Sequence, residues 1–148
     1  WTTRAPRPGE SADAYTFVDR ATFEARAAEG GFLEHAEFLD NFYGTPWPDA
    51  DADHDVVLEI DVQGAEQVLA REREALVVLL VPPSEEVQAD RLRGRGDPPE
   101  KVAERVEVAR TELQRGRALG AVEVVNDDLD DTVAEVHRLV AEARRTAR

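Results

Sequence analysis

The first side chains whose types and spacing suit a ligand are two arginines near the start of the chain. Arg4 and Arg7 flank Pro6, in a loop that the prolines stiffen. Two guanidinium groups held close together suit a phosphate, which accepts paired hydrogen bonds from a planar fork. The alternative is that both arginines lie on the surface and pair with local acids such as Glu10.

A second arginine cluster lies in residues 91–96 (RLRGRG), where Arg91, Arg93 and Arg95 alternate with other residues and Arg105 follows. The glycines indicate a mobile segment at the end of a helix. Such a segment could close over a polyphosphate, exclude water and place positive charge on a transferring group. The alternative is a solvated helix end whose positive charges complement the helix dipole.

Two acids end the β-branched run at residues 56–61, which predicts a strand of a parallel sheet. These are Glu59 and Asp61. Ligands of open α/β sheets bind beyond the carboxyl ends of the strands, so both acids are candidates for contact with substrate or Mg²⁺. A glycosidase with paired carboxylates is a competing hypothesis, but nothing else in the chain resembles a sugar cleft.

Three further polar residues, Glu34, Tyr43 and Thr45, stand among aromatic residues. A carboxylate can accept hydrogen bonds from N1–H and N2–H₂ of guanine, and a tyrosine hydroxyl can reach a phosphate. Each could equally be an ordinary residue at the boundary of the core. Residues 126–128 (NDD) are most simply a turn and a helix cap.

Composition limits the classes of protein that this chain can represent. Its 148 residues allow one domain or most of one, and the absence of cysteine excludes disulfides and thiolate chemistry. A net charge of −14 argues against a nucleic-acid polymer as partner. No apolar run approaches the roughly 20 residues of a membrane helix, and no leader is visible. We therefore expect a cytoplasmic protein without a membrane partner.

The order of elements predicts an α/β fold. Helices are expected at residues 21–29, 64–73, 84–93, 100–117 and 130–145. Strands are expected at 15–18, 32–34, 36–42, 56–61, 75–81 and 122–125, with 75–81 buried on both faces, and residues 47–55 as an exposed acidic loop. Strands that alternate with helices are typical of a parallel sheet with right-handed crossovers.

Five blocks of this sequence occur in the same order in guanylate kinases. They are residues 2–10 (TTRAPRPGE), 42–46 (FYGTP), 58–65 (LEIDVQGA), 91–96 (RLRGRG) and 124–129 (VVNDDL). The chain thus resembles a bacterial guanylate kinase along almost its whole length. The resemblance implies a nucleoside-monophosphate-kinase-like parallel sheet flanked by helices. It also implies a β-rich GMP-binding region at about 1–55, a core at about 56–90 and 106–148, and a lid at about 91–105.

The resemblance also implies a reaction and the residues that serve it. The family transfers the γ-phosphoryl group of ATP to GMP, with Mg²⁺. The positions that match its GMP-binding residues are Arg4, Arg7, Tyr15 and Tyr43 for the phosphate, Glu34, Thr45 and Asp61 for guanine, and Glu59 near the metal and phosphates. The positions that match its catalytic and ATP-binding residues are the lid and clamp arginines Arg91, Arg95 and Arg105, with Asn126 near adenine.

One family feature is missing from the 148 residues. The family has a strand and a phosphate-binding loop ahead of the TTR block, but no G-x-x-x-x-G-K-[ST] motif occurs here, and Lys101 is the sole lysine. We expect an N-terminally truncated guanylate kinase domain with very little kinase activity of its own. The alternatives are an inactive module that binds GMP or a phosphorylated partner, and a relic without activity.

Overall fold

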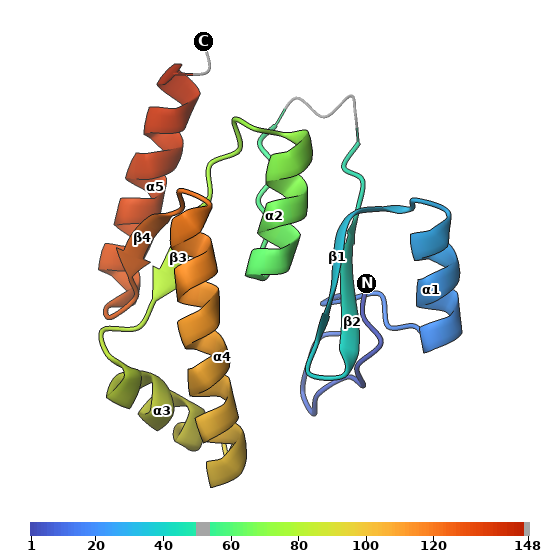
Figure 1. Ribbon diagram of the computed structural model, residues 1–148, viewed down its shortest axis with the longest axis horizontal. Helices are drawn as coiled ribbons and strands as arrows, with labels where there is room; N and C mark the ends of the chain where they lie inside the picture. The colour runs from blue at the N-terminus through green and yellow to red at the C-terminus, as the bar shows by residue number, and fades with distance from the viewer. Residues whose placement is uncertain (50–53, 147–148) are drawn as a thin grey trace. The chain divides into compact units, whose positions relative to one another are not determined.

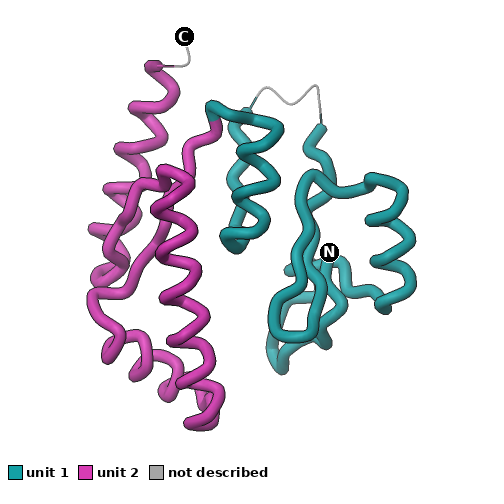
Figure 2. The backbone as a smooth tube through the Cα atoms, in the orientation of Figure 1, with its two compact units in different colours: residues 1–74 teal, residues 75–148 magenta. Residues whose placement is uncertain are grey.

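The computed structural model describes residues 1–49 and 54–146 (Figure 1). The chain divides into two compact units, residues 1–74 and 75–148 (Figure 2). The first contains α1 (Arg20–Ala28), β1 (Phe32–Phe38), β2 (Asn41–Pro46) and α2 (Val62–Arg71). The second contains β3 (Val78–Val81), α3 (Glu85–Gly94), α4 (Pro99–Ala118), β4 (Val122–Val125) and α5 (Leu129–Thr146). No helix in the described residues is both long and apolar enough to cross a membrane.

The first unit is built on an antiparallel hairpin of β1 and β2. Glu34 lies opposite Thr45 and Ala36 opposite Tyr43 in the strand register. Leu39 and Asp40 connect the strands with positive φ angles of 47° and 64°. Two left-handed residues in a two-residue loop give the twist that a hairpin needs. The hairpin thereby places two of the predicted site residues, Tyr43 and Thr45, on β2.

The first three residues of the chain lie between the hairpin and residues 16–18. The Thr2 N–H donates to the Thr16 carbonyl at 3.0 Å, and the Val18 N–H donates to the Thr2 carbonyl at 3.0 Å. On the other side the Thr3 N–H donates to the Phe42 carbonyl at 3.1 Å. The strand predicted at 15–18 is therefore reduced to a single bridging position, Phe17, rather than a full strand.

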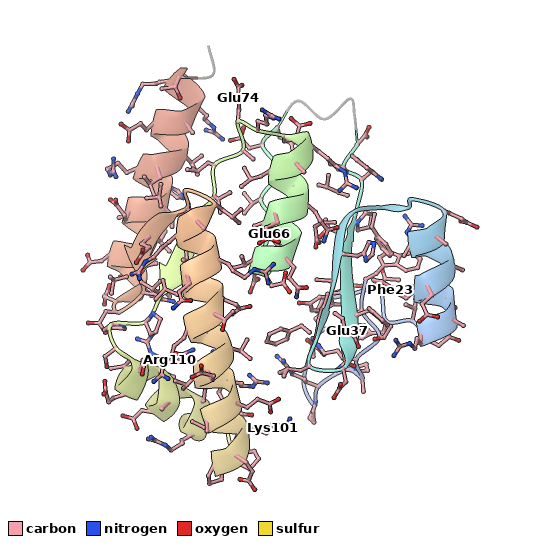
Figure 3. All side chains as sticks on the ribbon, viewed as in Figure 1. Phe23, Glu37, Glu66, Glu74, Lys101 and Arg110 are labelled. Carbon is pink, nitrogen blue, oxygen red and sulfur yellow. The ribbon has the colours of Figure 1, made fainter. Side chains whose placement is uncertain are left out.

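An aromatic cluster forms the core of the first unit. Phe23 projects from α1 and stacks on Phe32 and Phe42, with ring centroids 4.7 and 5.4 Å away (Figure 3). Asp19 caps the helix by accepting a hydrogen bond from the Thr22 N–H. Gly44 lies against these rings, and a Cβ there would lie 3.0 Å from carbon atoms of both Phe23 and Phe32, so a larger residue would push the rings apart.

Helix α2 packs against β1 within the same unit. The Gln67 side chain pairs with the His35 backbone, donating to its carbonyl at 2.7 Å and accepting from its N–H at 3.2 Å. Arg71 donates to the Leu33 carbonyl. These bonds from helix side chains satisfy the backbone of β1 on the edge away from β2. They fix where the N-terminus of α2 lies along the strand.

The second unit contains the parallel pair β3–β4 and three helices. Val78 to Val81 pair with Val122 to Val125 in register. Helix α4 packs on β3 and α5 on β4. The close approach of α4 needs Gly116, since a Cβ there would lie 2.8 Å from the Leu79 side chain. Arg110 of α4 donates two hydrogen bonds to the carboxylate of Glu85 and so ties α4 to α3 (Figure 3).

The structure also corrects the strands predicted at 36–42, 56–61 and 75–81. The first is interrupted by the left-handed turn at Leu39 and Asp40, which divides it between β1 and β2. Residues 56–61 form no ladder with any described residue, and the Val57 side chain is 88 % exposed. A β-branched segment forms a strand only when a neighbouring strand pairs with its backbone N–H and C=O groups. The composition of residues 56–61 was therefore not sufficient to predict a strand. The run at 75–81 forms a strand only from Val78. It is not buried on both faces, because Leu80 is 52 % exposed. The predicted loop at 47–55 includes residues 50–53, which lie outside the described residues.

The aromatic cluster predicts the effect of a core substitution. Phe23→Ala should lower the free energy of unfolding by about 3–5 kcal/mol, because it removes a ring that is 1 % exposed and leaves a cavity. Val57→Ala is the control and should change it by less than about 0.5 kcal/mol, because that side chain is exposed. Urea denaturation followed by circular dichroism measures both. Equal losses in the two variants would contradict the assignment of this core.

Candidate functional site

The Arg4 guanidinium lies against two aromatic rings of the first unit. Its carbon is 4.9 Å from the centroid of the Tyr15 ring and 5.5 Å from that of Phe17. Tyr15 in turn meets Tyr43 edge to face, with centroids 6.3 Å apart. The pairing of residues 1–3 with β2 and with residues 16–18 brings these segments together. Three residues predicted to bind phosphate, Arg4, Tyr15 and Tyr43, are therefore neighbours.

Glu10 holds the Arg4 guanidinium by a two-point ion pair. Arg4 Nη1 donates to Glu10 Oε2 at 2.8 Å, and Nη2 donates to Oε1 at 2.5 Å. Both side chains are largely buried, at 11 % and 15 % exposed. Hydrogen bonding from Arg4, and then from the Arg7 backbone, lowers the pKa of the Glu10 carboxyl to about 2. The same pair raises the pKa of Arg4.

Arg7 is exposed, and its guanidinium makes no hydrogen bond or ion pair with the described residues. Its backbone N–H donates to Glu10 Oε2 at 2.9 Å. One carboxylate thus fixes the side chain of one arginine and the backbone of the next. From the sequence, Glu10 was expected only as a local acid with which these arginines could pair on the surface. Glu10 lies three residues after Arg7 and six after Arg4, and this regular spacing could have indicated a link to both arginines.

The second predicted group, for guanine, centres on a buried carboxylate. Glu34 is 4 % exposed, and Thr45 Oγ1 donates to its Oε1 at 2.5 Å. The two residues are paired across the hairpin, so the strand register itself makes this contact. A buried carboxylate needs such donors, since burying an unpaired charge is costly. The opposite side of the carboxylate, Oε2, faces α2.

Asp61 and Gly64 complete this group at the N-terminus of α2. Asp61 Oδ1 accepts a hydrogen bond from the Gly64 N–H at 2.8 Å and so caps the helix. A Cβ at Gly64 would lie 2.5 Å from Glu34 Oε2, which shows how closely the helix approaches the carboxylate. Gly64 was not among the predicted site residues. Its signal is a glycine within the first turn of a helix, where it costs stability and calls for a packing reason.

Glu59 is not joined to this group. It is exposed and makes no hydrogen bond or ion pair with the described residues. The part of the chain that the structure describes also holds no group of three or more histidine, aspartate or glutamate residues arranged to bind a metal ion.

In the second unit, Arg91 reaches the loop that follows β4. Its Nη1 donates to the Asn126 carbonyl at 2.7 Å and its Nη2 to the Asp127 carbonyl at 3.4 Å. The Asp127 carboxylate lies 3.7 Å away. These contacts bring Arg91 and Asn126 together at the carboxyl end of β4, as two residues predicted to bind ATP.

The other two predicted arginines behave differently from Arg91. Arg105 Nη1 lies 3.7 Å from Asp97 Oδ2, while Arg105 Nε and Asp97 Oδ2 are buried without a hydrogen-bond partner among the described residues. Arg95 ends α3, and its side chain is exposed. The Arg95 side chain makes no hydrogen bond or ion pair with the described residues.

The ion pair between Arg4 and Glu10 predicts a low titration midpoint. The Glu10 carboxyl should titrate near pH 2 in carbon-detected NMR, because the folded protein favours its charged form. Its contribution to stability is complete above about pH 4.5 and is lost as the pH falls through about 2. In Arg4→Ala the midpoint should move up toward 4.5. An unchanged midpoint would contradict the assigned cause.

The buried pair of Glu34 and Thr45 predicts a cost for losing the hydroxyl. Thr45→Val keeps the shape of the side chain but leaves Glu34 Oε1 without its donor. The free energy of unfolding should fall by about 1–3 kcal/mol. Thr16→Val is the control, since the Thr16 side chain is exposed and its hydroxyl has no described hydrogen bond. Thermal and urea unfolding of both variants measure the difference, and equal effects would argue against the pair.

The amino-acid sequence of this chain is similar to those of known proteins. The family model for guanylate kinase matches residues 1–143. Guanylate kinases of Thermus thermophilus and Deinococcus radiodurans are each 46 % identical over 154 aligned positions, which cover 99 % of this chain and 70 % and 64 % of those proteins.

The fold agrees with that assignment. The crystal structure of guanylate kinase from Anaplasma phagocytophilum matches with a TM-score of 0.76 and 32 % identity, over 95 % of this chain and 71 % of that one. The predicted α/β fold with a parallel sheet is thereby confirmed, and the chain belongs to the guanylate kinase family of nucleoside monophosphate kinases.

Proposed function

We propose that this chain serves the transfer of the γ-phosphoryl group of ATP to GMP, which yields ADP and GDP. One observation carries the proposal. The first unit holds both a cationic and aromatic cluster around Arg4 and a buried carboxylate, Glu34, with a hydroxyl donor. A phosphate and a guanine base need these two kinds of group. The relatives named above are guanylate kinases, which supports the same reaction.

The guanine part of the proposal rests on Glu34, Thr45 and Asp61. Guanine presents two donors, N1–H and N2–H₂, on one edge, and carboxylates accept from such donors. Adenine presents an acceptor at N1, so it would leave a carboxylate unpaired. A site with a buried acceptor discriminates strongly against a ligand that lacks the matching donor. We therefore propose that Glu34 and Asp61 select guanine, while Thr45 holds Glu34 in place.

The phosphate part rests on Arg4, Arg7, Tyr15 and Tyr43. Two guanidinium groups and two phenol hydroxyls would bind the phosphate of GMP, whose oxygen is the nucleophile of the reaction. No nucleophilic side chain is needed, since phosphoryl transfer is catalysed by positioning and by neutralising charge. We propose that the arginines of the second unit, Arg91, Arg95 and Arg105, supply positive charge to the phosphates of ATP, and that Asn126 lies toward adenine.

The proposal also defines what these 148 residues do not supply. They contain no G-x-x-x-x-G-K-[ST] motif, so the backbone cradle and lysine that hold the phosphates of ATP in related kinases are not among them. We propose that Mg²⁺ arrives bound to the phosphates of ATP, and the described side chains form no metal site that would replace those ligands. The proposed setting is the cytoplasm, where both nucleotides are available.

A second candidate is a module that binds GMP or a phosphorylated partner without catalysis. The absence of the phosphate-binding motif from this sequence favours it. The buried Glu34 with its Thr45 donor favours a guanine ligand over a phosphopeptide, because a peptide would not need that pair.

Calorimetric titration tests the choice of ligand. GMP should bind in the micromolar range, and AMP should bind at least about tenfold more weakly, because it lacks the donors that Glu34 and Asp61 require. Arg4→Ala should abolish GMP binding, and the control Arg20→Ala, whose arginine pairs with Glu24 on the exposed face of α1, should not. Binding of a phosphoserine peptide with no response to GMP would instead support the second candidate.

A coupled assay tests the reaction. With ATP, Mg²⁺ and GMP, the 148-residue polypeptide should turn over at least about a hundredfold more slowly than the roughly 1–100 s⁻¹ of kinases in general, since it lacks a phosphate cradle. Arg91→Ala should then change little further. Ordinary turnover by this polypeptide would show that its own residues bind the phosphates of ATP.

A further inference from the structure

We propose that Glu10 is a positioning residue that presents one edge of the Arg4 guanidinium to the phosphate of GMP. The inference rests on the proposed function, and it concerns a residue to which neither the motif comparison nor the proposed reaction gives a role. It identifies which two hydrogens of Arg4 receive the ligand.

The donors of Arg4 can be counted. A guanidinium has five N–H groups. Nη1 donates to Glu10 Oε2 at 2.8 Å and to the Ala5 carbonyl at 3.0 Å, and Nη2 donates to Glu10 Oε1 at 2.5 Å. The Nε hydrogen and the second Nη2 hydrogen make no hydrogen bond with the described residues. These two hydrogens point the same way, along one edge of the guanidinium, with the spacing that a phosphate accepts.

The surroundings of Arg4 restrict its guanidinium to this orientation. The Tyr15 and Phe17 rings lie near it, at 4.9 and 5.5 Å from its carbon, and the side chain is only 11 % exposed. Glu10 occupies the end of the group formed by Nη1 and Nη2. The Nε–Nη2 edge is therefore the part of Arg4 left to bind an anion.

Glu10 also fixes the backbone that carries the second arginine. Its Oε2 accepts from the Arg7 N–H at 2.9 Å, and its own N–H donates to the Arg7 carbonyl at 3.1 Å. The turn between them passes through Gly9 with φ of 79°, a conformation that glycine adopts without strain. A single carboxylate thus sets the orientation of Arg4 and the course of the loop at Arg7.

Two possible roles of Glu10 predict opposite changes in GMP affinity when the residue is replaced by a neutral one. If Glu10 merely competed with the ligand for Arg4, its removal would relieve repulsion of the phosphate, and GMP would bind more tightly. If Glu10 positions Arg4, its removal lets the guanidinium rotate, and GMP binding must then immobilise it. The direction of the change therefore separates a positioning role from a competing one.

Calorimetry of the 148-residue protein measures this direction. Glu10→Gln should weaken GMP binding about threefold to tenfold, the cost of immobilising one long side chain. Binding of guanosine, which has no phosphate, should not change. Glu24→Gln is the matched control, since it removes one carboxylate from an exposed ion pair with Arg20 and should alter neither ligand. In an Arg4→Lys background the effect of Glu10→Gln should become smaller, because no fork remains to be oriented and only the loop at Arg7 still depends on Glu10.

Several results would overturn the inference. GMP binding that is unchanged or tighter in Glu10→Gln excludes positioning, and equal losses for GMP and guanosine indicate a structural defect instead. If the parent protein binds neither ligand, the proposed function fails. In that case ¹⁵N NMR of the Arg4 Nε–H still decides the matter, with inorganic phosphate as the probe. Phosphate should shift this signal in the parent protein at concentrations about threefold to tenfold lower than in Glu10→Gln, and equal titrations of both would refute the role of Glu10.

Discussion

The burial of one carboxylate constrains most of the first unit. Glu34 is 4 % exposed, and a charge in that position must have donors close by. Thr45 supplies one only because the hairpin register sets it opposite Glu34, and that register depends on the left-handed turn at residues 39–40. On the other side, α2 approaches so closely that Gly64 cannot carry a side chain. Turn, register and helix position therefore all converge on the environment of one side chain.

The arginine side chains differ in whether hydrogen-bond acceptors of the protein hold them in one orientation. Arg4 is fixed by Glu10, and Arg91 is fixed by two carbonyls after β4. Arg7 and Arg95 have exposed side chains without such partners among the residues described. In a chain with a net charge of −14, acids are abundant, so an arginine kept for a ligand needs either a defined geometry or isolation from those acids. Net charge alone therefore says little about where an anion can bind.

The sequence predicted the helices well, because caps and apolar periodicity are local signals. Asp19 and Ser84, two residue types that commonly precede helices, cap α1 and α3. The strands were less predictable, since Val56 and Val57 have the composition of a strand but no described neighbour that takes their hydrogen bonds. At the candidate site, residue types and the family resemblance predicted roles for Arg4, Glu34 and Thr45, but not the exchange of hydrogen bonds through Glu10 or the contact at Gly64. Those depend on distances between segments, which no single motif encodes.

The pairing of residues 1–3 with two other segments has a consequence for how this region tolerates change. Thr2 is fully buried, and Thr3 both donates to and accepts from Phe42. Successive side chains of an extended segment point to opposite faces, so a one-residue shift would exchange buried positions with more exposed ones. A one-residue shift of residues 2–3 against their partners would therefore disturb both the hydrogen-bonded core and the position of Arg4, whereas many substitutions would disturb only one of them.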